Sequence, residues 1–195
     1  MKLIMIRHGE PTYESVRARN FIGSSVNFGE LTPDGIKQAE LVSHDERLIG
    51  AELIVSSPYT RALHTAAIIS KNTGLNISTE IDLREWSPDL TQKVSTKKET
   101  SASFKECLAH NGVRTPDCIY NWESAESVGI RAFQCLKKYI NYNKIIVVAH
   151  AMLIRQFGYF QKDFPYCGIY EVEFDENSVW NGFKIELAQL NDVKM

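Results

Sequence analysis

Two histidines and two arginines stand at the ends of short apolar runs, where their side chains could together bind and attack a phosphoryl group. Arg7 and His8 follow the run KLIMI. Arg61 lies one helical turn beyond LIVSS, and His150 ends IIVVAH. Unprotonated imidazole is a nucleophile, and guanidinium groups fit phosphate oxygens and stay charged at any working pH. Alone, His8 would suit a polar loop, but the set of four predicts a site for phosphoryl transfer.

A proton donor for the leaving group would complete this chemistry. A leaving alkoxide needs a proton, and a positioned carboxylic acid can supply it for roughly 10²–10⁴-fold in rate. Glu85 is the first candidate, because it ends the run IDLRE. Glu10 is a competing candidate, although it lies next to the turn of the nucleophile and could serve in positioning. We also predict that Glu10, Gly23 and Ser24 contact the substrate.

Three short apolar runs rich in β-branched residues are the strands expected to position these side chains. They cover residues 3–6, 53–57 and 145–150, and residues 77–83 form a weaker fourth candidate. Nearly continuous apolar runs are typical of parallel strands that are covered on both faces. Ligands bind beyond the carboxyl ends of such strands, so the residues that follow the runs are expected to converge on one rim.

Helical patterns separate these runs. The first helix is expected to begin at Thr32, whose hydroxyl can cap it and which precedes a proline suited to the first helical position. The second begins near residues 57–58 and stops at Gly74. Two further helices are expected at residues 104–108 and 128–140.

The alternation of strand and helix predicts an α/β domain. We expect a three-layer sandwich in which a mostly parallel central sheet carries helices on both faces. Residues 168–187 alternate around 175–177 like a hairpin, which predicts antiparallel C-terminal strands. The length fits one domain over residues 1–195. The polar, lysine-rich residues 91–103 predict an exposed loop, and an insertion over about 87–103 is a candidate lid.

Charge and composition argue against several classes of protein. The formal net charge of −2 disfavours a general nucleic-acid binder, which would carry a basic face. No window approaches the length of a membrane span, and the first apolar run is too short for the core of a signal peptide. We therefore expect a cytoplasmic protein whose partner is a small phosphorylated substrate rather than nucleic acid or a membrane.

The remaining cysteines and histidines indicate no metal site. Cysteines occur at 107, 118, 135 and 167, without a C-x-x-C pair or a histidine at zinc spacing, so reduced core thiols are expected. Carboxylate clusters at ligand spacing are also missing, and we predict neither a metal nor a cofactor. His44 and His110 belong to no motif and are expected at the surface, whereas His64 is expected to pack against the fold.

Several motifs occur together in an order that resembles the histidine phosphatase superfamily, the phosphoglycerate mutase-like proteins. An ordered set of this kind is far more specific than any single motif. The matching stretches are RHGE at 7–10, LTPDG at 31–35, SPYTRALHTA at 57–66, LRE at 83–85, ES at 123–124 and VAH at 148–150.

The resemblance implies a role for each residue of the predicted site. His8 would become phosphorylated, Arg7, Arg61 and His150 would hold the phosphoryl group together with it, and Glu85 would act first as acid and then as base. The resemblance implies no metal. We therefore predict a metal-independent phosphatase that hydrolyses a small phosphate monoester through a phosphohistidine.

Two alternatives remain beside this prediction. One is phosphoglycerate mutase-type transfer between two hydroxyls, and the other is a catalytically weak protein that binds a phosphorylated ligand. The second is motivated by Ala151, which stands where the family usually has glycine, and by Glu14, which lies where many members carry asparagine. A carboxylate that pointed into the site would repel phosphate.

Overall fold

The computed structural model describes residues 1–94, 96–158 and 164–183. The strands are β1 (Lys2–Arg7), β2 (Leu53–Ser56), β3 (Ile77–Thr79), β4 (Lys144–Ala149) and β5 (Ile169–Glu173). The α-helices are α1 (Glu14–Ala18), α2 (Pro33–Val42), α3 (Thr60–Thr73), α4 (Lys97–Ala109), α5 (Ala125–Lys137) and α6 (Ala151–Ile154). Three short 3₁₀ helices are η1 (Gly23–Phe28), η2 (Glu46–Leu48) and η3 (Ile81–Leu83).

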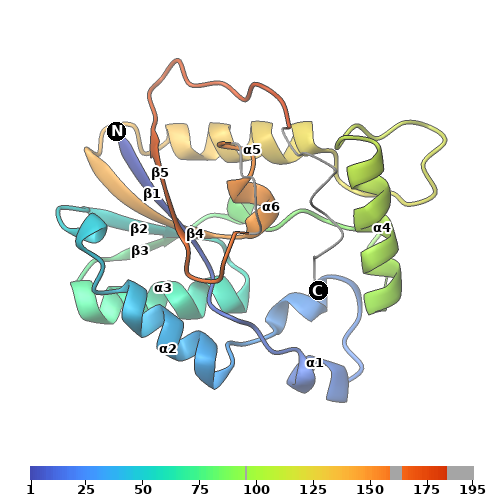
Figure 1. The fold of residues 1–195 in the computed structure, drawn as a ribbon, viewed down its shortest axis with the longest axis horizontal. Coiled ribbons are helices and arrows are strands. Elements are labelled where there is room, and N and C mark those ends of the chain that lie inside the picture. Colours follow the sequence, from blue (N-terminus) through green and yellow to red (C-terminus); the bar gives the residue numbers. More distant parts are fainter. Residues whose placement is uncertain (95, 159–163, 184–195) are drawn as a thin grey trace.

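The five strands form one sheet in the order β3-β2-β4-β1-β5 (Figure 1). The first four strands in this order run parallel, and β5 pairs with β1 in the antiparallel direction. β4 therefore lies between β1 and β2, although it comes late in the chain. This order places the carboxyl ends of β1, β2 and β4 side by side.

Helices cover both faces of the sheet, so the predicted three-layer α/β sandwich is confirmed (Figure 1). Side chains alternate along β1: Leu3 and Met5 enter the core beneath α5 and α6, whereas Ile4 and Ile6 enter the core beneath α2 and α3. All four are fully buried. Because both faces are covered, these strands appear in the sequence as continuous apolar runs rather than as alternating ones.

Two of the three helix boundaries predicted from start and stop signals are confirmed, and the third is wrong, because α3 begins at Thr60 rather than at residues 57–58. The Thr32 side chain accepts a hydrogen bond of 2.9 Å from the Gly35 N–H at the start of α2. Helix α3 ends at Gly74, whose φ of 75° lies in the left-handed region that glycine tolerates. Capping chemistry is local, which explains why the sequence alone located both positions.

The predicted exposed loop at residues 91–103 is wrong from residue 97 onward, where α4 begins. Thr96 and Glu99 form a capping box in which each side chain pairs with the other's backbone N–H. Helix α4 includes the predicted helix 104–108 but extends over Lys97–Ala109. Its first turns lack an apolar stripe because most of their residues do not face the core, and hydrophobic spacing could not reveal them.

Two other predictions hold only in part. The weak strand at 77–83 is a strand over Ile77–Thr79 alone, and η3 follows it. In the predicted hairpin, β5 forms the first arm and the Asp175 carboxylate accepts the Asn177 N–H in the turn. Residues 174–183 contain no second strand, and the rest of the predicted hairpin lies outside the described residues. The helix expected at 128–140 is α5, which covers Ala125–Lys137 and so begins and ends three residues earlier.

Within the part of the chain that the structure describes, no helix is both long enough and apolar enough to cross a bilayer.

All four cysteines are free thiols, and Cys107 and Cys135 are buried in the core. Burial raises the pKa of both of these thiols to about 12, so they are protonated at neutral pH.

Candidate active site

The order of the sheet brings the two predicted catalytic histidines together. His8 follows β1 and His150 follows β4, and the His8 N–H donates to the Ala149 carbonyl oxygen at 3.0 Å. The two imidazole rings are 5.1 Å apart between centroids and meet edge to face. Both side chains are buried. Neighbouring parallel strands thus supply two imidazoles to one pocket at their carboxyl ends.

The turn after His8 packs tightly against the start of α2. A Cβ on Gly9 would lie 2.5 Å from the Gly35 carbonyl oxygen, and a Cβ on Gly35 would lie 2.2 Å from the Glu10 carbonyl oxygen. Both positions therefore require glycine. The Gly9 N–H also donates to the Thr65 hydroxyl of α3 at 3.0 Å. The backbone that carries His8 is fixed by two helices.

The hydrogen-bond partners of His8 identify its tautomer. Nδ1 lies 2.7 Å from the Gly9 carbonyl oxygen, which can only accept, so Nδ1 carries the proton. Nε2 lies 3.2 Å from Nε of Arg61, which can only donate, so Nε2 presents a lone pair. His8 is thus a neutral imidazole whose unprotonated Nε2 accepts a hydrogen bond from a cation.

Arg61 lies in the first turn of α3 and is only 5% exposed. Besides its bond to His8, it donates to the Asn27 side-chain oxygen at 3.2 Å, and its guanidinium lies 5.1 Å from the Tyr59 ring centroid. A cation at the amino end of a helix opposes the helix dipole. The same arrangement favours an anion, since guanidinium and backbone N–H groups both attract one.

Arg7 supplies the second guanidinium from the end of β1. It lies 4.0 Å from the centroid of the Tyr166 ring and donates to the Phe164 carbonyl oxygen. The Tyr166 ring is 5.7 Å from that of His8. A guanidinium stacked on an aromatic face is restricted to one orientation. Each arginine of the site is therefore held against a tyrosine.

Burial and positive charge keep both histidines unprotonated. The pKa of His8 is well below the usual 6.5, first because it is buried and second because Arg61 is adjacent. Burial also lowers the pKa of His150, and Arg61 and His8 lower it further. At neutral pH the site therefore holds two neutral imidazoles near the guanidiniums of Arg61 and Arg7.

These depressed pKa values predict a loss of stability in weak acid. Histidines in the unfolded chain take up protons below about pH 6.5, whereas the buried pair resists protonation, so stability is full above that pH and falls as the pH drops below it. Each histidine contributes at most about 1.4 kcal/mol per pH unit. Urea unfolding in phosphate-free buffer between pH 7.5 and 5.5 measures the slope. His150→Gln should roughly halve it; an unchanged slope would contradict the prediction.

Glu85 lies just after η3 and reaches the start of α6. Its carboxylate accepts three backbone hydrogen bonds, from Trp86 at 2.8 Å, from Met152 at 3.2 Å and from Leu153 at 3.3 Å. The last two donors follow directly after His150 and Ala151, so Glu85 and His150 are anchored to the same helix start. Ala151 has a negative φ, and a side chain there causes no backbone strain.

A buried charge network fixes the backbone that carries Glu85. Arg131 of α5 donates to the Glu123 carboxylate at 2.8 and 3.1 Å, and also to the carbonyl oxygens of Asp82, Arg84 and Glu85. Glu123 is 1% exposed and accepts a further bond from Arg84 at 3.1 Å. One guanidinium thus connects α5 to three backbone carbonyl oxygens of the segment that positions the carboxylic acid.

Loss of this network should destabilise the fold. Arg131→Met would leave the buried Glu123 carboxylate with Arg84 as its remaining cationic partner, beside hydrogen bonds from Ser87 and Ser127. Breaking a buried ion pair costs about 3 kcal/mol. Denaturant unfolding should show this loss, whereas Arg114→Met, at an exposed position, should change stability by less than about 0.5 kcal/mol. Adding Glu123→Gln should recover part of the loss. If Arg131→Met and Arg114→Met were equally stable, a stabilising role for Arg131 would be refuted.

The sequence as a whole matches one protein family. A sequence model of the histidine phosphatase superfamily (branch 1) matches residues 3–182. The chain belongs to branch 1 of the histidine phosphatase superfamily. The family resemblance predicted from the ordered motifs is confirmed.

Curated relatives of this superfamily member are named as mutases. The probable phosphoglycerate mutase GpmB of Citrobacter koseri is 29% identical over 141 residues, which cover 70% of this chain and 64% of that protein. GpmB of Yersinia pestis strain Pestoides F is 27% identical over 161 residues, which cover 79% of this chain and 71% of that protein. The chain thus spans less than two thirds of the first relative's length.

Solved structures of similar fold include several phosphatases. The mycobacterial glucosyl-3-phosphoglycerate phosphatase has a TM-score of 0.67 at 21% identity, covering 87% of this chain and 88% of that chain. A putative alpha-ribazole-5'-P phosphatase from Escherichia coli has a TM-score of 0.63 at 19% identity, covering 95% and 99%. These likenesses show a shared fold.

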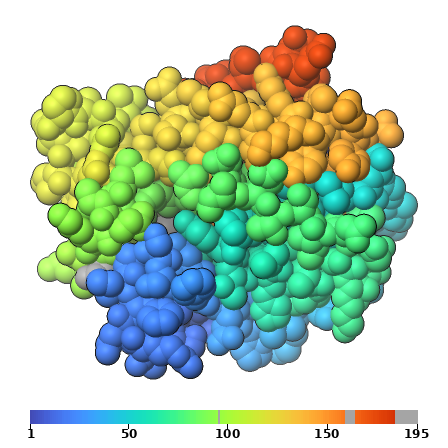
Figure 2. All heavy atoms as spheres, turned by 180° about the vertical axis from the view of Figure 1, so that it is seen from behind, coloured from blue at the N-terminus to red at the C-terminus, as the bar shows by residue number. Residues whose placement is uncertain are grey.

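The residues predicted to contact the substrate lie in two places. The Glu10 carboxylate accepts the Thr32 hydroxyl at 2.9 Å, so in this structure it pairs with the start of α2. The Ser24 hydroxyl donates to the Gln92 side chain, and a Cβ on Gly23 would lie 2.6 Å from the Gln92 carbonyl oxygen. Figure 2 shows this N-terminal segment, in blue, against the green segment that contains Gln92.

Glu14, which could have repelled phosphate, is exposed in the first turn of α1.

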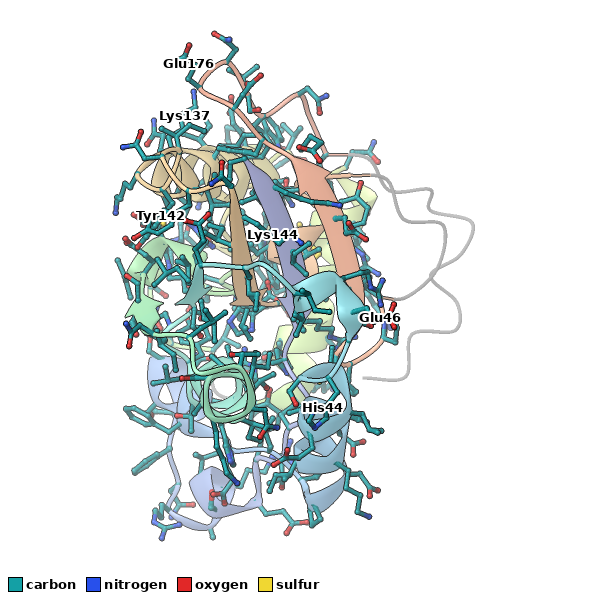
Figure 3. The ribbon with its side chains drawn as sticks, turned by 90° about the vertical axis from the view of Figure 1, so that its left-hand side faces the viewer. His44, Glu46, Lys137, Tyr142, Lys144 and Glu176 are labelled. Atoms are coloured by element: carbon teal, nitrogen blue, oxygen red, sulfur yellow. The ribbon has the colours of Figure 1, made fainter. Side chains whose placement is uncertain are left out.

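The other three histidines lie outside the site. His44 is exposed beyond α2, on the side of the molecule where β4 begins at Lys144 (Figure 3), and His64 is half-buried, both as predicted. His110 was predicted at the surface but is half-buried, with its ring 6.5 Å from that of Trp122.

Sequence reasoning missed three residues that contact the arginines. Tyr59 precedes Arg61 by two positions, so its nearness in the same turn was a usable signal. Asn27 and Tyr166 approach from distant segments, and no spacing in the sequence indicated them.

Among the described residues, no three His, Cys, Asp or Glu side chains gather closely enough to hold a metal ion.

Proposed function

We propose that this protein is a metal-independent phosphatase that hydrolyses a small phosphate monoester through a phosphohistidine on His8. The observation that carries the proposal is the unprotonated Nε2 of buried His8, which lies 3.2 Å from the Nε of the equally buried Arg61. A phosphate dianion repels anionic nucleophiles, so a neutral nucleophile flanked by cations suits it. Arg7 and His150 border the same pocket.

In the first step, Nε2 of His8 attacks phosphorus while the bond from phosphorus to the leaving oxygen breaks. Arg7, Arg61 and His150 bind the phosphoryl oxygens, and Glu85 transfers its proton to the leaving oxygen. A carboxylate has about four lone-pair sites, and backbone N–H groups use three on Glu85. One site is left for the transferable proton.

In the second step, water attacks the phosphohistidine and the phosphorus–nitrogen bond breaks. Glu85 removes a proton from this water and so regains the proton that it gave up. His8 leaves the step neutral, as the lowered pKa of its imidazole favours. Phosphate is then released, and the pocket returns to its starting protonation state.

The non-phosphate part of the substrate would contact η1 and the segment around Gln92. These two segments contact each other through Ser24, and Asn27 of η1 reaches the phosphate-binding Arg61. This arrangement supports the predicted substrate contacts at Gly23 and Ser24. It also supports a role for residues 87–103 in bordering the substrate.

The experiment that tests the function is rapid quenching during turnover of a ³²P-labelled phosphate monoester with chelator present. A phosphohistidine is labile in acid and stable in alkali, so label should remain on the protein after an alkaline quench and disappear after an acidic one. Turnover without any trapped label would exclude the covalent route. Phosphate binding without turnover would instead identify a phospho-ligand-binding protein.

The second candidate is phosphoryl transfer to another hydroxyl, favoured by the probable phosphoglycerate mutases among the relatives. The same phosphohistidine would then be attacked by an alcohol in place of water. Isotope partitioning with added phosphoglycerates separates the two functions. Label released as inorganic phosphate supports the phosphatase, and label recovered in an isomeric phosphoglycerate supports the mutase.

A further inference from the structure

One buried hydrogen bond connects His150 to a serine that has no assigned role. Nε2 of His150 lies 2.7 Å from the Ser57 hydroxyl oxygen, and both residues are fully buried. Ser57 follows β2, the strand next to β4, so the sheet order itself creates the contact. Either atom could be the donor, and the choice determines what His150 presents to a bound phosphoryl group.

The surrounding hydrogen bonds favour one direction. The Ser57 oxygen already accepts the Tyr59 N–H at 3.3 Å. If His150 also donated to it, the hydroxyl proton would need another acceptor, and the described residues provide none. Leaving a buried hydroxyl proton unpaired is unfavourable, because the proton loses its hydrogen bond to water and gains no other. If Ser57 donates to Nε2, its proton and its oxygen are both paired.

The other ring nitrogen of His150 is Nδ1. Nδ1 is buried and has no hydrogen-bond partner among the described residues. A neutral imidazole whose Nε2 accepts must carry its proton on Nδ1. Nδ1–H is then an unpaired donor in the pocket that also holds His8 and Arg61, and an anion bound there would satisfy it.

We infer that Ser57 is a positioning residue that donates its hydroxyl proton to Nε2 of His150 and thereby holds Nδ1–H ready for a phosphoryl oxygen. The inference rests on the proposed function for the identity of that anion. It assigns opposite tasks to two neutral imidazoles. The Gly9 carbonyl fixes His8 with a bare Nε2 for attack, and the Ser57 hydroxyl fixes His150 as a donor.

This assignment explains how the pocket can add a hydrogen-bond donor without adding charge. A protonated His150 would also donate, but burial and the neighbouring Arg61 lower its pKa. A neutral His150 with the opposite tautomer would direct a lone pair at the phosphate oxygens. Ser57 therefore converts a neutral ring into a donor, as second partners of histidine commonly do.

The test reads the tautomer directly, by long-range ¹H–¹⁵N correlation on protein with ¹⁵N-labelled histidines at pH 7.5. His150 is assigned by comparison with His150→Gln. The expected wild-type spectrum has a protonated Nδ1 and a bare Nε2 on His150. A protonated Nε2 would overturn the inference whatever the serine variants do, since the tautomer is read on the native protein.

Two adjacent buried serines provide a matched pair of variants. Ser57→Ala should mix the tautomers of His150 and weaken binding of inorganic phosphate about tenfold. Ser57→Thr should restore part of the tautomer preference and part of the phosphate affinity. Ser56→Ala removes a hydroxyl of equal burial that donates to a backbone carbonyl, so both readouts should keep wild-type values. If Ser57→Ala matches Ser56→Ala in tautomer and affinity, the inference fails. Neither readout needs turnover. A failure of this inference is therefore distinct from a failure to trap a phosphoenzyme.

Discussion

His8→Ala should abolish turnover of an aryl phosphate while the protein stays folded. The substitution removes Nε2, the only atom of the pocket that combines a bare lone pair with an adjacent Arg61 donor among the described residues. Removal of a nucleophile that forms a covalent intermediate lowers turnover by about 10⁴- to 10⁶-fold in comparable enzymes. Steady-state kinetics should therefore show kcat near the background, and rapid quenching should trap no label.

The matched control is His64→Ala, one turn beyond Arg61 on the same helix. His64 is half-buried and contacts neither arginine nor the other histidines of the pocket in any bond that the structure describes, so its loss should leave kcat unchanged. Circular dichroism and phosphate binding should show that His8→Ala is folded. More than about 1% of wild-type turnover in folded His8→Ala would contradict the phosphohistidine route, because a water nucleophile would not need this imidazole.

The residues at strand ends could be predicted because local sequence determines them. Each buried strand is a continuous apolar run, so its last residue is visible, and polar groups after it must lie at the sheet's carboxyl edge. This reasoning located Arg7, His8 and His150. It did not give the order of the strands, and that order is what makes His8 and His150 neighbours.

The contacts that tune the site could not be predicted because they join distant segments. Asn27 reaches Arg61, and Tyr166 stacks on Arg7, through packing that no periodicity encodes. The start of α4 was missed for a different reason, since a polar capping box at Thr96 replaced the apolar stripe that helix prediction relies on. The Thr32 cap of α2 precedes a proline and an apolar stripe, whereas the Thr96 cap of α4 precedes a lysine-rich turn.

The direction of the hydrogen bonds also lay beyond the sequence. The motif around His8 indicates an imidazole in a site, yet only the Gly9 carbonyl and the Arg61 Nε determine which nitrogen is bare. The same holds for Glu85, whose three backbone donors come from its own neighbour and from α6. Residue types indicate the chemistry, and the packed backbone determines which atom of each side chain donates and which accepts.

Glu85→Gln should slow esters of poorly leaving alcohols by about 10²–10⁴-fold while activated aryl esters lose far less. The amide cannot give a proton to an alkoxide, whereas a nitrophenolate departs without one. The amide also has one acceptor oxygen in place of two, so its NH₂ group would face a backbone N–H at the start of α6. That second effect would disturb His150 and reduce turnover of both kinds of ester equally.

The comparison of esters therefore separates the two effects. We would measure kcat/KM for an alkyl phosphate and a nitrophenyl phosphate with wild-type protein, Glu85→Gln and Glu126→Gln. Glu126 is exposed on α5, so the same chemical change there should leave both rates intact. A loss in Glu85→Gln that is larger for the alkyl ester supports proton donation. Equal losses for the two esters would assign Glu85 to holding the start of α6, and the proton would have to come from another group.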